Sequence, residues 1–143
     1  MLKGINPLLN PDVLHALAAM GHADTLAIVD SNFPAFSVAS ETVYKKVLRM
    51  DCSMPQALEA VLSLFPIDSF VDNPVNSMQV VGDPKEVPEV ITEAAQILDQ
   101  QQVQITSLER FEFYAATKQS FAIIQTTESR IYANLILSKG VIA

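Results

Sequence analysis

Helical patterns alternate with short apolar runs along the chain, and this alternation limits the possible folds more than any other feature. The run Thr25–Val29 is almost continuously apolar and ends at Asp30, which is typical of a strand covered on both faces of a parallel sheet. Ahead of it, Asn10-Pro11-Asp12 supplies a capping residue, a first-turn proline and a first-turn acid, the order that favours a helix start. The alternation predicts an α/β fold, with one domain over residues 1–143, a mainly parallel sheet and helices on both of its faces.

The same periodicity predicts the remaining elements. Gly21 is expected to end the first helix, and Ser53 and Gln56 have the spacing of a capping box that starts another. Further helices are expected after residue 88 and over 110–119, and strands over 43–50, 77–81, 103–108, 121–124 and 132–137.

Composition and charge exclude several kinds of protein. Hydrophobic residues make up 50% of the chain and charged residues 17%, so the chain has enough apolar material for a folded core. The formal net charge is −7 and no cluster of Lys and Arg occurs. Nucleic acid is therefore not an expected partner, because an acidic protein repels phosphates. No apolar run reaches the roughly 20 residues of a membrane helix, so no membrane partner is expected either.

Cysteine use and hydropathy indicate where the protein works and how it assembles. Cys52 is the one cysteine, so it cannot form an internal disulfide, and we expect it to be a small buried side chain. The N-terminus has no apolar stretch of the signal-peptide kind, and we expect a cytoplasmic protein. The mean hydropathy of +0.27 predicts apolar interfaces between identical subunits.

His22 is the first candidate for chemistry. It follows the expected helix end and precedes the buried strand, so it lies on a loop at an edge of the sheet. A free imidazole has a pKa of about 6.5 and can both donate and accept protons near neutral pH. The alternative is a histidine that only satisfies carbonyls at the helix end.

Other candidates lie where regular elements meet loops. Asp30 follows the carboxyl end of a strand, the usual position for ligands in open α/β sheets; the alternative is an aspartate that caps its own loop. Arg110 precedes three aromatic residues, and a planar donor beside apolar rings suits the vicinal hydroxyls of a sugar, although aromatic residues at helical spacing also form ordinary core. Tyr132 and Asn134 alternate with Ala133, so both are expected to point to one face of the last strand as a hydroxyl-reading pair.

Several catalytic motifs are missing. The four glycines are not clustered, which excludes a Gly-rich phosphate loop. His15, expected on an exposed helix face, and His22 have no partnering cysteine, which argues against a zinc site. No serine stands in the G-x-S-x-G context of a hydrolase nucleophile. We therefore expect no metal and no cofactor.

Five stretches of the chain form an ordered set: Gly21-His22-Ala23-Asp24, residues 30–35, Arg110-Phe111-Glu112-Phe113-Tyr114, Tyr132-Ala133-Asn134 and Lys139-Gly140-Val141. Taken in this order, they resemble the L-fucose mutarotase/D-ribose pyranase family. The resemblance implies an α/β fold, assembly into rings that are often decamers, and sites completed at subunit boundaries. It also implies sugar isomerisation without metal or cofactor.

Matching by position assigns roles. The resemblance implies that His22 is the proton donor, with Asp30 and Tyr132 as further candidates for the catalytic group, and that the sugar is held by Asp30, Arg110, Tyr132, Ala133 and Asn134. Residues 32–34 and the aromatic stretch after Arg110 resemble the fucose branch, whereas Tyr132-Ala133-Asn134 is familiar from the ribose branch. Ala23 and Ala133 stand where the fucose branch usually has glycine, so a methyl at each is expected to narrow the pocket or to change a turn that needs φ > 0.

Mutarotation requires few residues. It opens a cyclic hemiacetal and recloses it on the other face of the carbonyl, so one group removes the anomeric hydroxyl proton while another protonates the ring oxygen. The resemblance favours L-fucose as the monosaccharide substrate, with His22 transferring the proton and Asp30 orienting either the histidine or a hydroxyl. Two alternatives stay open: a D-ribose pyranase, which interconverts pyranose and furanose forms, and a non-catalytic sugar-binding module in which Ala23 or Ala133 has spoiled proton transfer.

Overall fold

The computed structural model describes residues 1–143 as one α/β unit built on a six-stranded sheet. In the sheet the strand order is β2-β5-β1-β6-β3-β4. Strands β1 and β2 are both parallel to β5, and β3 is parallel to β4, whereas β6 runs antiparallel to β1 and β3. The predicted mainly parallel sheet is therefore confirmed. The elements are α1 (Pro11–Ala19), β1 (Thr25–Val29), α2 (Ala35–Ala39), β2 (Val47–Met50), α3 (Met54–Leu62), β3 (Val75–Met78), α4 (Glu89–Asp99), β4 (Ile105–Leu108), α5 (Arg110–Lys118), β5 (Ala122–Thr126) and β6 (Leu135–Ser138).

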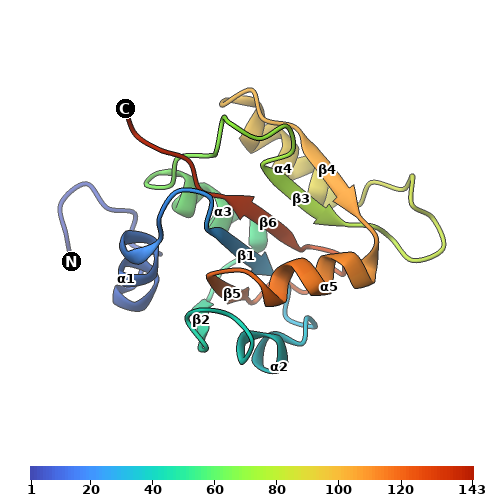
Figure 1. The fold of residues 1–143 in the computed structure, drawn as a ribbon, viewed down its shortest axis with the longest axis horizontal. Coiled ribbons are helices and arrows are strands. Elements are labelled where there is room, and N and C mark those ends of the chain that lie inside the picture. The colour runs from blue at the N-terminus through green and yellow to red at the C-terminus, as the bar shows by residue number, and fades with distance from the viewer.

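Helices cover both faces of the sheet, as predicted. One core cluster packs α1, α3 and α4 against one face, and a second packs α2 and α5 against the other. Figure 1 shows α5 in front of the sheet, with α3 and α4 behind it. Within β1, Leu26 and Ile28 belong to the first cluster, and Ala27 and Val29 belong to the second. Successive side chains of a strand point to opposite faces, so a strand covered twice must be apolar throughout.

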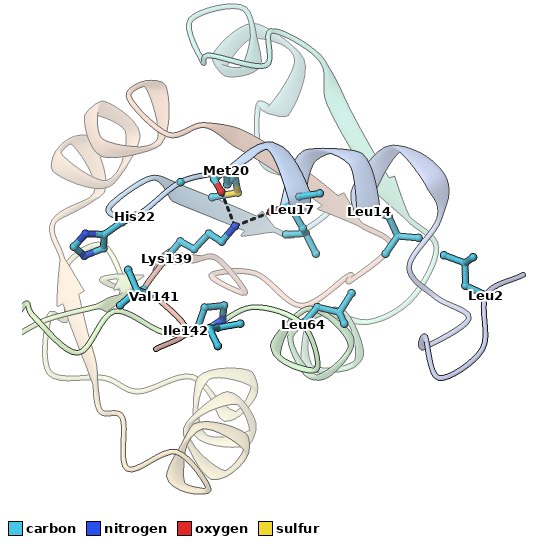
Figure 2. Close-up of a pocket in the computed structure, with 13 residues that line it drawn as sticks. Leu2, Leu14, Leu17, Met20, His22, Leu64, Lys139, Val141 and Ile142 are labelled. Atoms are coloured by element: carbon cyan, nitrogen blue, oxygen red, sulfur yellow. Dashed lines mark hydrogen bonds between the residues drawn. The ribbon is translucent and has the colours of Figure 1, made fainter.

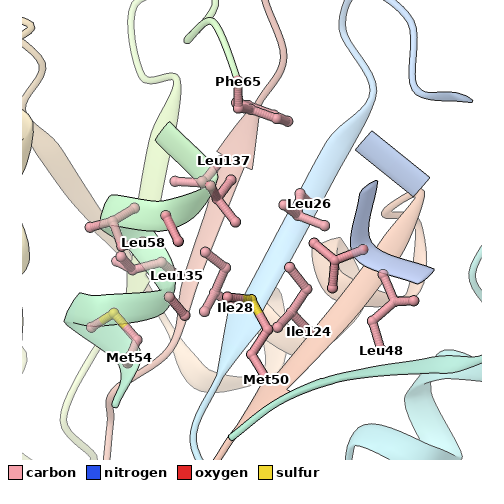
Figure 3. Packing of buried hydrophobic residues seen from close by; sticks show 14 of the residues in the cluster. Leu26, Ile28, Leu48, Met50, Met54, Leu58, Phe65, Ile124, Leu135 and Leu137 are labelled. Atoms are coloured by element: carbon pink, nitrogen blue, oxygen red, sulfur yellow. The ribbon is translucent and has the colours of Figure 1, made fainter. Parts of the chain in front are cut away.

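The larger cluster carries most of the buried apolar side chains. Figure 3 shows Leu26 and Ile28 of β1 beside Leu135 and Leu137 of β6, with Met54 and Leu58 of α3 packed over them. All of these side chains come from elements that were predicted from their apolar spacing or from a capping pattern. These side chains are completely buried, and their burial stabilises the sheet. The sheet in turn holds the polar residues at its two ends in place.

Two helix starts follow the predicted capping chemistry. The Asn10 side chain accepts a hydrogen bond from the Val13 N–H, and both bonds of the capping box between Ser53 and Gln56 are present. The end of α1 has a different cause from the one expected. Its cap is Met20 in an extended conformation, and the adjacent Gly21 does not adopt a positive φ.

Some element bounds were wrong, each for a local reason. The strand expected over 43–50 begins only at Val47, because Lys45 adopts a φ of 59°. The strand expected over 77–81 is Val75–Met78, and helix α2 was not predicted, since five residues without a side-chain cap leave no clear signal. The last strand begins at Leu135, because Tyr132 adopts a φ of 62°. Tyr132 and Asn134 therefore lie in the turn before β6 and do not alternate along a strand.

The antiparallel strand β6 joins segments that are distant in the sequence. Its carboxyl end lies at the amino end of β1, where the Ala23 N–H donates to the Lys139 carbonyl (2.9 Å) and the Lys139 N–H donates to the Asp24 carbonyl (2.8 Å). On the other side of the same strand end, the Asp68 N–H donates to the Ser138 carbonyl (3.0 Å). The loops that carry His22 and Asp68 are thus fixed to one another through β6. None of the helices has the length and apolar character needed to cross a membrane.

Candidate active site

Asp30, Arg110, Tyr132 and Asn134 lie together in a hollow at the carboxyl end of β1. The hollow has a volume of about 180 Å³, and we call it the Asp30 hollow. Parallel strands present their carboxyl ends at one edge of the sheet, so the loops after β1, β3 and β4 and the turn before β6 meet there. Its full lining is Asp30, Asn32, Phe33, Met78, Val81, Arg110, Tyr114, Ile131, Tyr132 and Asn134.

Asp30 and Asn134 form a buried reciprocal pair. The Asp30 N–H donates to Asn134 Oδ1 at 2.9 Å, and Asn134 Nδ2 donates to Asp30 Oδ2 at 3.1 Å. The other carboxylate oxygen of Asp30 accepts from the N–H groups of Asn32 and Phe33, so the aspartate does cap its loop. Burial raises the pKa of Asp30 above its usual value, while these hydrogen bonds oppose the rise. The pair holds the turn before β6 against the end of β1.

Arg110 is the first residue of α5 and lines the hollow, and one of its donors is unused. Its guanidinium lies over the Phe111 ring, 4.6 Å from the centroid, and its buried Nε has no hydrogen-bond partner in the chain. A buried donor without an acceptor costs about 1–3 kcal/mol, and an oxygen of a ligand would remove that cost. Of the neighbouring aromatic residues, Phe113 is completely buried in the second core cluster, so for this residue the ordinary core interpretation holds.

Tyr132 reaches the hollow from a strained turn. Its φ of 62° is unusual for a bulky residue. Residues with such strained backbone conformations occur mainly at functional sites of proteins. Its hydroxyl oxygen accepts a hydrogen bond from the Val81 N–H at 3.2 Å. The hydroxyl proton is therefore free to be donated to a ligand.

Ala133 lies between the lining residues Tyr132 and Asn134, but its side chain points away from the hollow into the core. Its side chain is completely buried in the larger core cluster, and it is not part of the lining of the hollow. The expected narrowing of the pocket by the Ala133 methyl is therefore wrong. Only the backbone of Ala133 is directed to this site, where its N–H hydrogen-bonds the Asp30 carboxylate.

His22 lies at the opposite end of β1. It occupies the exposed loop between α1 and β1, in which Ala23 adopts a φ of 67°, so the expected need for φ > 0 at this alanine is confirmed. The five residues of β1 span roughly 16 Å at about 3.3 Å per residue. A single chain therefore does not bring His22 and Asp30 into a shared hollow, so Asp30 does not orient His22 within one chain. The expectation that it orients the histidine or a hydroxyl of the sugar stays a prediction for a site shared between chains.

A second hollow, of about 680 Å³, lies beside His22; we call it the His22 hollow. Figure 2 shows His22 and Val141 at one end of it and Leu2 at the other. Lys139 lies between them and donates from Nζ to the carbonyls of Leu17 (2.8 Å) and Met20 (2.6 Å). The lysine, and not the histidine, thus satisfies the carbonyls at the end of α1, which removes the alternative interpretation of His22.

Asp68 is the functional candidate that the sequence did not reveal. Its Oδ1 lies 3.3 Å from His22 Nε2, and its side chain is 1% exposed against 45% for the histidine. The only signal in the sequence is an isolated acid that directly follows the apolar residues Pro66 and Ile67. That signal does not indicate His22 as the partner of Asp68. The two residues are 46 positions apart in the sequence, and their contact depends on the direction of β6.

Each hollow is open and bordered by exposed apolar side chains. At 180 Å³ the Asp30 hollow is smaller than the roughly 300–1,000 Å³ typical of complete ligand pockets. Val81, Phe111 and Ile131 are exposed near the Asp30 hollow, and Phe70 and Ile142 are exposed near His22. Each end of the sheet therefore combines polar side chains with exposed apolar ones.

Two further expectations concern the positions of single residues. Cys52 is buried and His15 is exposed on α1, both as predicted. The chain has no group of three or more His, Cys, Asp or Glu side chains placed to hold a metal ion.

The class of protein is defined by a mainly parallel α/β sheet with a polar hollow at one end and, at the other, His22 beside a largely apolar hollow. Comparison with known proteins identifies the family. The sequence profile of the RbsD / FucU transport protein family matches residues 3–142. The fucose mutarotase of Homo sapiens is 43% identical over 148 residues, which cover 99% of this chain and 95% of that protein. The L-fucose mutarotase of Haemophilus influenzae (strain 86-028NP) is 39% identical over 145 residues, which cover 99% of this chain and 97% of that protein. The chain belongs to the RbsD/FucU family.

Solved structures agree with this assignment. The fucose mutarotase from Streptococcus pneumoniae, solved in complex with L-fucose, superposes with a TM-score of 0.89 at 35% identity and covers 99% of this chain and 100% of its own. RbsD of Bacillus subtilis, complexed with D-ribose, superposes with a TM-score of 0.70 at 25% identity, and both chains are covered completely. The fold is thus shared with both proteins, and the similarity is greater to the fucose mutarotase.

Proposed function

We propose that this protein is an L-fucose mutarotase, an isomerase that interconverts the α and β anomers of the sugar without a cofactor. The observation that carries the proposal is the gathering of Asp30, Arg110, Tyr132 and Asn134 in one hollow, where the buried Arg110 Nε lacks an acceptor. Such a set of donors and acceptors beside apolar walls suits a monosaccharide. The similarity to fucose mutarotases of human and bacterial origin supports the same choice of substrate.

The proposed site is completed by two copies of the chain. His22 and the Asp30 hollow lie at opposite ends of β1, so the histidine of one subunit would meet the hollow of the next. A contact between two different surfaces is heterologous, and repeated heterologous contacts form a ring when the rotation from one subunit to the next closes. The exposed apolar side chains that border both ends support burial at such contacts. We propose a ring-shaped homo-oligomer, a decamer, located in the cytoplasm.

In this site the reaction needs only proton transfers. Tyr132 donates its free hydroxyl proton to the ring oxygen O5 as the C1–O5 bond breaks, while neutral His22 takes the proton of the anomeric hydroxyl as C1 becomes a carbonyl. In the reverse transfer His22 donates that proton to the C1 oxygen, and Tyr132 recovers its own proton from the O5 hydroxyl. Rotation about the C1–C2 bond and the reverse transfers close the ring with the other anomeric configuration. General acid–base catalysis of this kind contributes roughly 10²–10⁴-fold.

The other groups hold the sugar while its ring is open. Arg110 and Asn134 bind hydroxyl groups, and Asp30 fixes the Asn134 amide and accepts from a hydroxyl. The backbone of Ala133 completes this binding group. Met78 and Ile131 supply apolar wall, which suits the methyl group of a 6-deoxy sugar such as fucose better than it suits ribose.

D-ribose is the second candidate substrate. The Tyr132-Ala133-Asn134 turn favours it, as does the shared fold with the ribose-bound RbsD. A non-catalytic sugar-binding module is the third possibility, because Ala23 imposes strain beside His22. Each possibility predicts a different pattern of exchange.

Magnetisation-exchange NMR tests the proposal. Protein is added at a low molar ratio to equilibrated L-fucose and, separately, to equilibrated D-ribose. We expect exchange cross-peaks between the two fucopyranose anomers, with slower exchange among the ribose forms. Faster exchange of pyranose and furanose ribose would favour the pyranase, and line broadening without cross-peaks would favour the binding module.

A pair of histidine variants provides the control. His22→Ala is expected to abolish the exchange, whereas His15→Ala, which changes an exposed histidine on α1, is expected to leave it intact. Full exchange in His22→Ala would remove His22 from the mechanism.

A further inference from the structure

We propose that Asp68 is the positioning residue for His22: it fixes the tautomer and the orientation of the imidazole so that Nδ1 is the nitrogen that exchanges a proton with the sugar. The part that concerns the sugar rests on the proposed function, whereas the part that concerns the tautomer does not. The juxtaposition of a completely buried carboxylate with a half-exposed imidazole, 3.3 Å apart, carries the inference.

The contact determines which ring nitrogen carries the proton. An ionised carboxylate can only accept hydrogen bonds. The Asp68 Oδ1 can therefore bond His22 Nε2 only when Nε2 carries the hydrogen. In the neutral ring Nδ1 then has a free lone pair, and no group of the chain donates to it. This nitrogen can take a proton from a hydroxyl group or, once protonated, return it.

The rest of the environment restricts the ring to one orientation. The Phe70 ring packs edge-on against the imidazole, with centroids 5.4 Å apart and an interplanar angle of 61°. The Phe70 N–H donates to the same Asp68 oxygen at 3.0 Å, which holds the carboxylate in place. His22 is therefore held at Nε2 and on one ring face, while the Nδ1 edge is left for a ligand.

The fold holds Asp68 rigidly with respect to the histidine loop. Its N–H donates to the Ser138 carbonyl, and the Gly140 N–H donates to the Pro66 carbonyl at 2.8 Å. A side chain at Gly140 would have no room, because a Cβ there would lie 2.6 Å from the Ile67 carbonyl oxygen and 2.9 Å from the Asp68 Cα. The segment that carries Asp68 is thus packed directly against the strand end that also binds Ala23.

Asp30 cannot take this role within the chain. It lies at the far end of β1, roughly 16 Å from the histidine loop, and its hydrogen bonds within the chain are to Asn32, Phe33 and Asn134. Asp68 accepts only one other hydrogen bond, from the Phe70 N–H. A carboxylate that positions a histidine by accepting from one ring nitrogen acts on catalysis through that histidine.

Long-range ¹H–¹⁵N NMR of the imidazole tests the tautomer in the unmodified protein. At a pH where His22 is neutral, we expect Nε2 to carry the proton and Nδ1 to show the shift of an unprotonated ring nitrogen. An Nδ1-protonated ring in the wild type would overturn the proposal. This measurement needs no sugar, so it stands even if exchange is absent with fucose and ribose alike and the proposed function fails.

Variants at two aspartates test the effect on the reaction. Asp68→Asn is expected to shift His22 toward a mixture of tautomers and to lower kcat by roughly ten- to a hundredfold, a part of the acid–base contribution, with KM nearly unchanged. Asp68→Glu, which keeps the carboxylate, is expected to recover part of the kcat. Asp72→Asn, an exposed aspartate on the same segment, is the matched control and should leave both tautomer and kcat unchanged.

The outcomes separate positioning from simple support of the fold. A fall in KM and kcat together with lost thermal stability, and no change of tautomer, would overturn the proposal. Equal kcat values for Asp68→Asn and Asp72→Asn would also overturn it. A change of tautomer with kcat lowered at constant KM, and partial recovery in Asp68→Glu, would support it.

Discussion

Complementation between two inactive variants tests whether the site is shared between subunits. His22→Ala removes the proton-transfer group at one end of β1, and Arg110→Ala removes a sugar-binding donor at the other end. These ends are roughly 16 Å apart in one chain. An oligomer that contains only one of the two variants therefore has no complete site at any contact between subunits. An oligomer that contains both variants can form complete sites, because the intact histidine of one variant can meet the intact hollow of the other.

The expected activity follows from counting contacts. When the two variants are produced together in equal amounts and mix randomly, a contact is complete only if His22 comes from the Arg110→Ala chain and the hollow from the His22→Ala chain. About a quarter of the contacts meet this condition, so about a quarter of the wild-type activity should return. A site contained in one chain would recover no activity at all.

The assay uses two affinity tags, one on each variant, and sequential purification of oligomers that contain both chains. Exchange between fucose anomers is then measured by NMR at equal total protein. Wild type mixed with the double variant His22→Ala/Arg110→Ala is the control: a shared site gives about a quarter of the activity, and a site within one chain gives about half. No recovery in the first mixture together with half activity in the second would refute the two-subunit site.

Three other substitutions test the structure around the site. Ala23→Gly should raise the free energy of unfolding by up to about 1 kcal/mol in urea denaturation, because glycine has no steric cost at φ 67°; an equal or lower stability would contradict the strain at this turn. Gly140→Ala should lower it by about 1–3 kcal/mol, because the added Cβ meets the Ile67 carbonyl oxygen at 2.6 Å; an unchanged midpoint would contradict the close packing. Hydrogen bonds from Arg130 hold the pKa of Glu128 at about 2, below its ordinary 4.5, so its contribution to stability is present above pH 4.5 and is lost as the pH falls toward 2. Unfolding midpoints of Glu128→Gln should therefore change less than those of the wild type between pH 5 and pH 2, and parallel curves would contradict this account.

Periodicity and capping patterns predicted most regular elements, because these signals are local. The apolar run Thr25–Val29 predicted β1 with its correct bounds, since a strand buried on both faces needs an apolar residue at every position. Asn10 and the Ser53–Gln56 pair predicted two helix starts, because capping satisfies backbone groups within one turn. Short elements such as α2 were missed, since few residues give little periodicity.

The candidate site was only partly accessible from the sequence. The position of Asp30 after a buried strand and the donor at Arg110 were visible, because open α/β sheets bind ligands at carboxyl ends. The placement of Tyr132 and Asn134 on a strand was wrong, because the positive φ of Tyr132 delays the start of β6. Nothing local indicated that the Ala133 methyl turns into the core.

The sequence by itself determined the chemistry that the chain carries: an exposed imidazole beside a buried strand, and polar groups at the other end of that strand. Only the tertiary structure decided how these groups are combined. The length of β1 separates His22 from Asp30, and the antiparallel course of β6 brings Asp68 to His22 across 46 residues. The physical reason is that capping and periodicity act over a few residues, whereas the partner of a side chain depends on the direction and order of strands that are distant in the sequence.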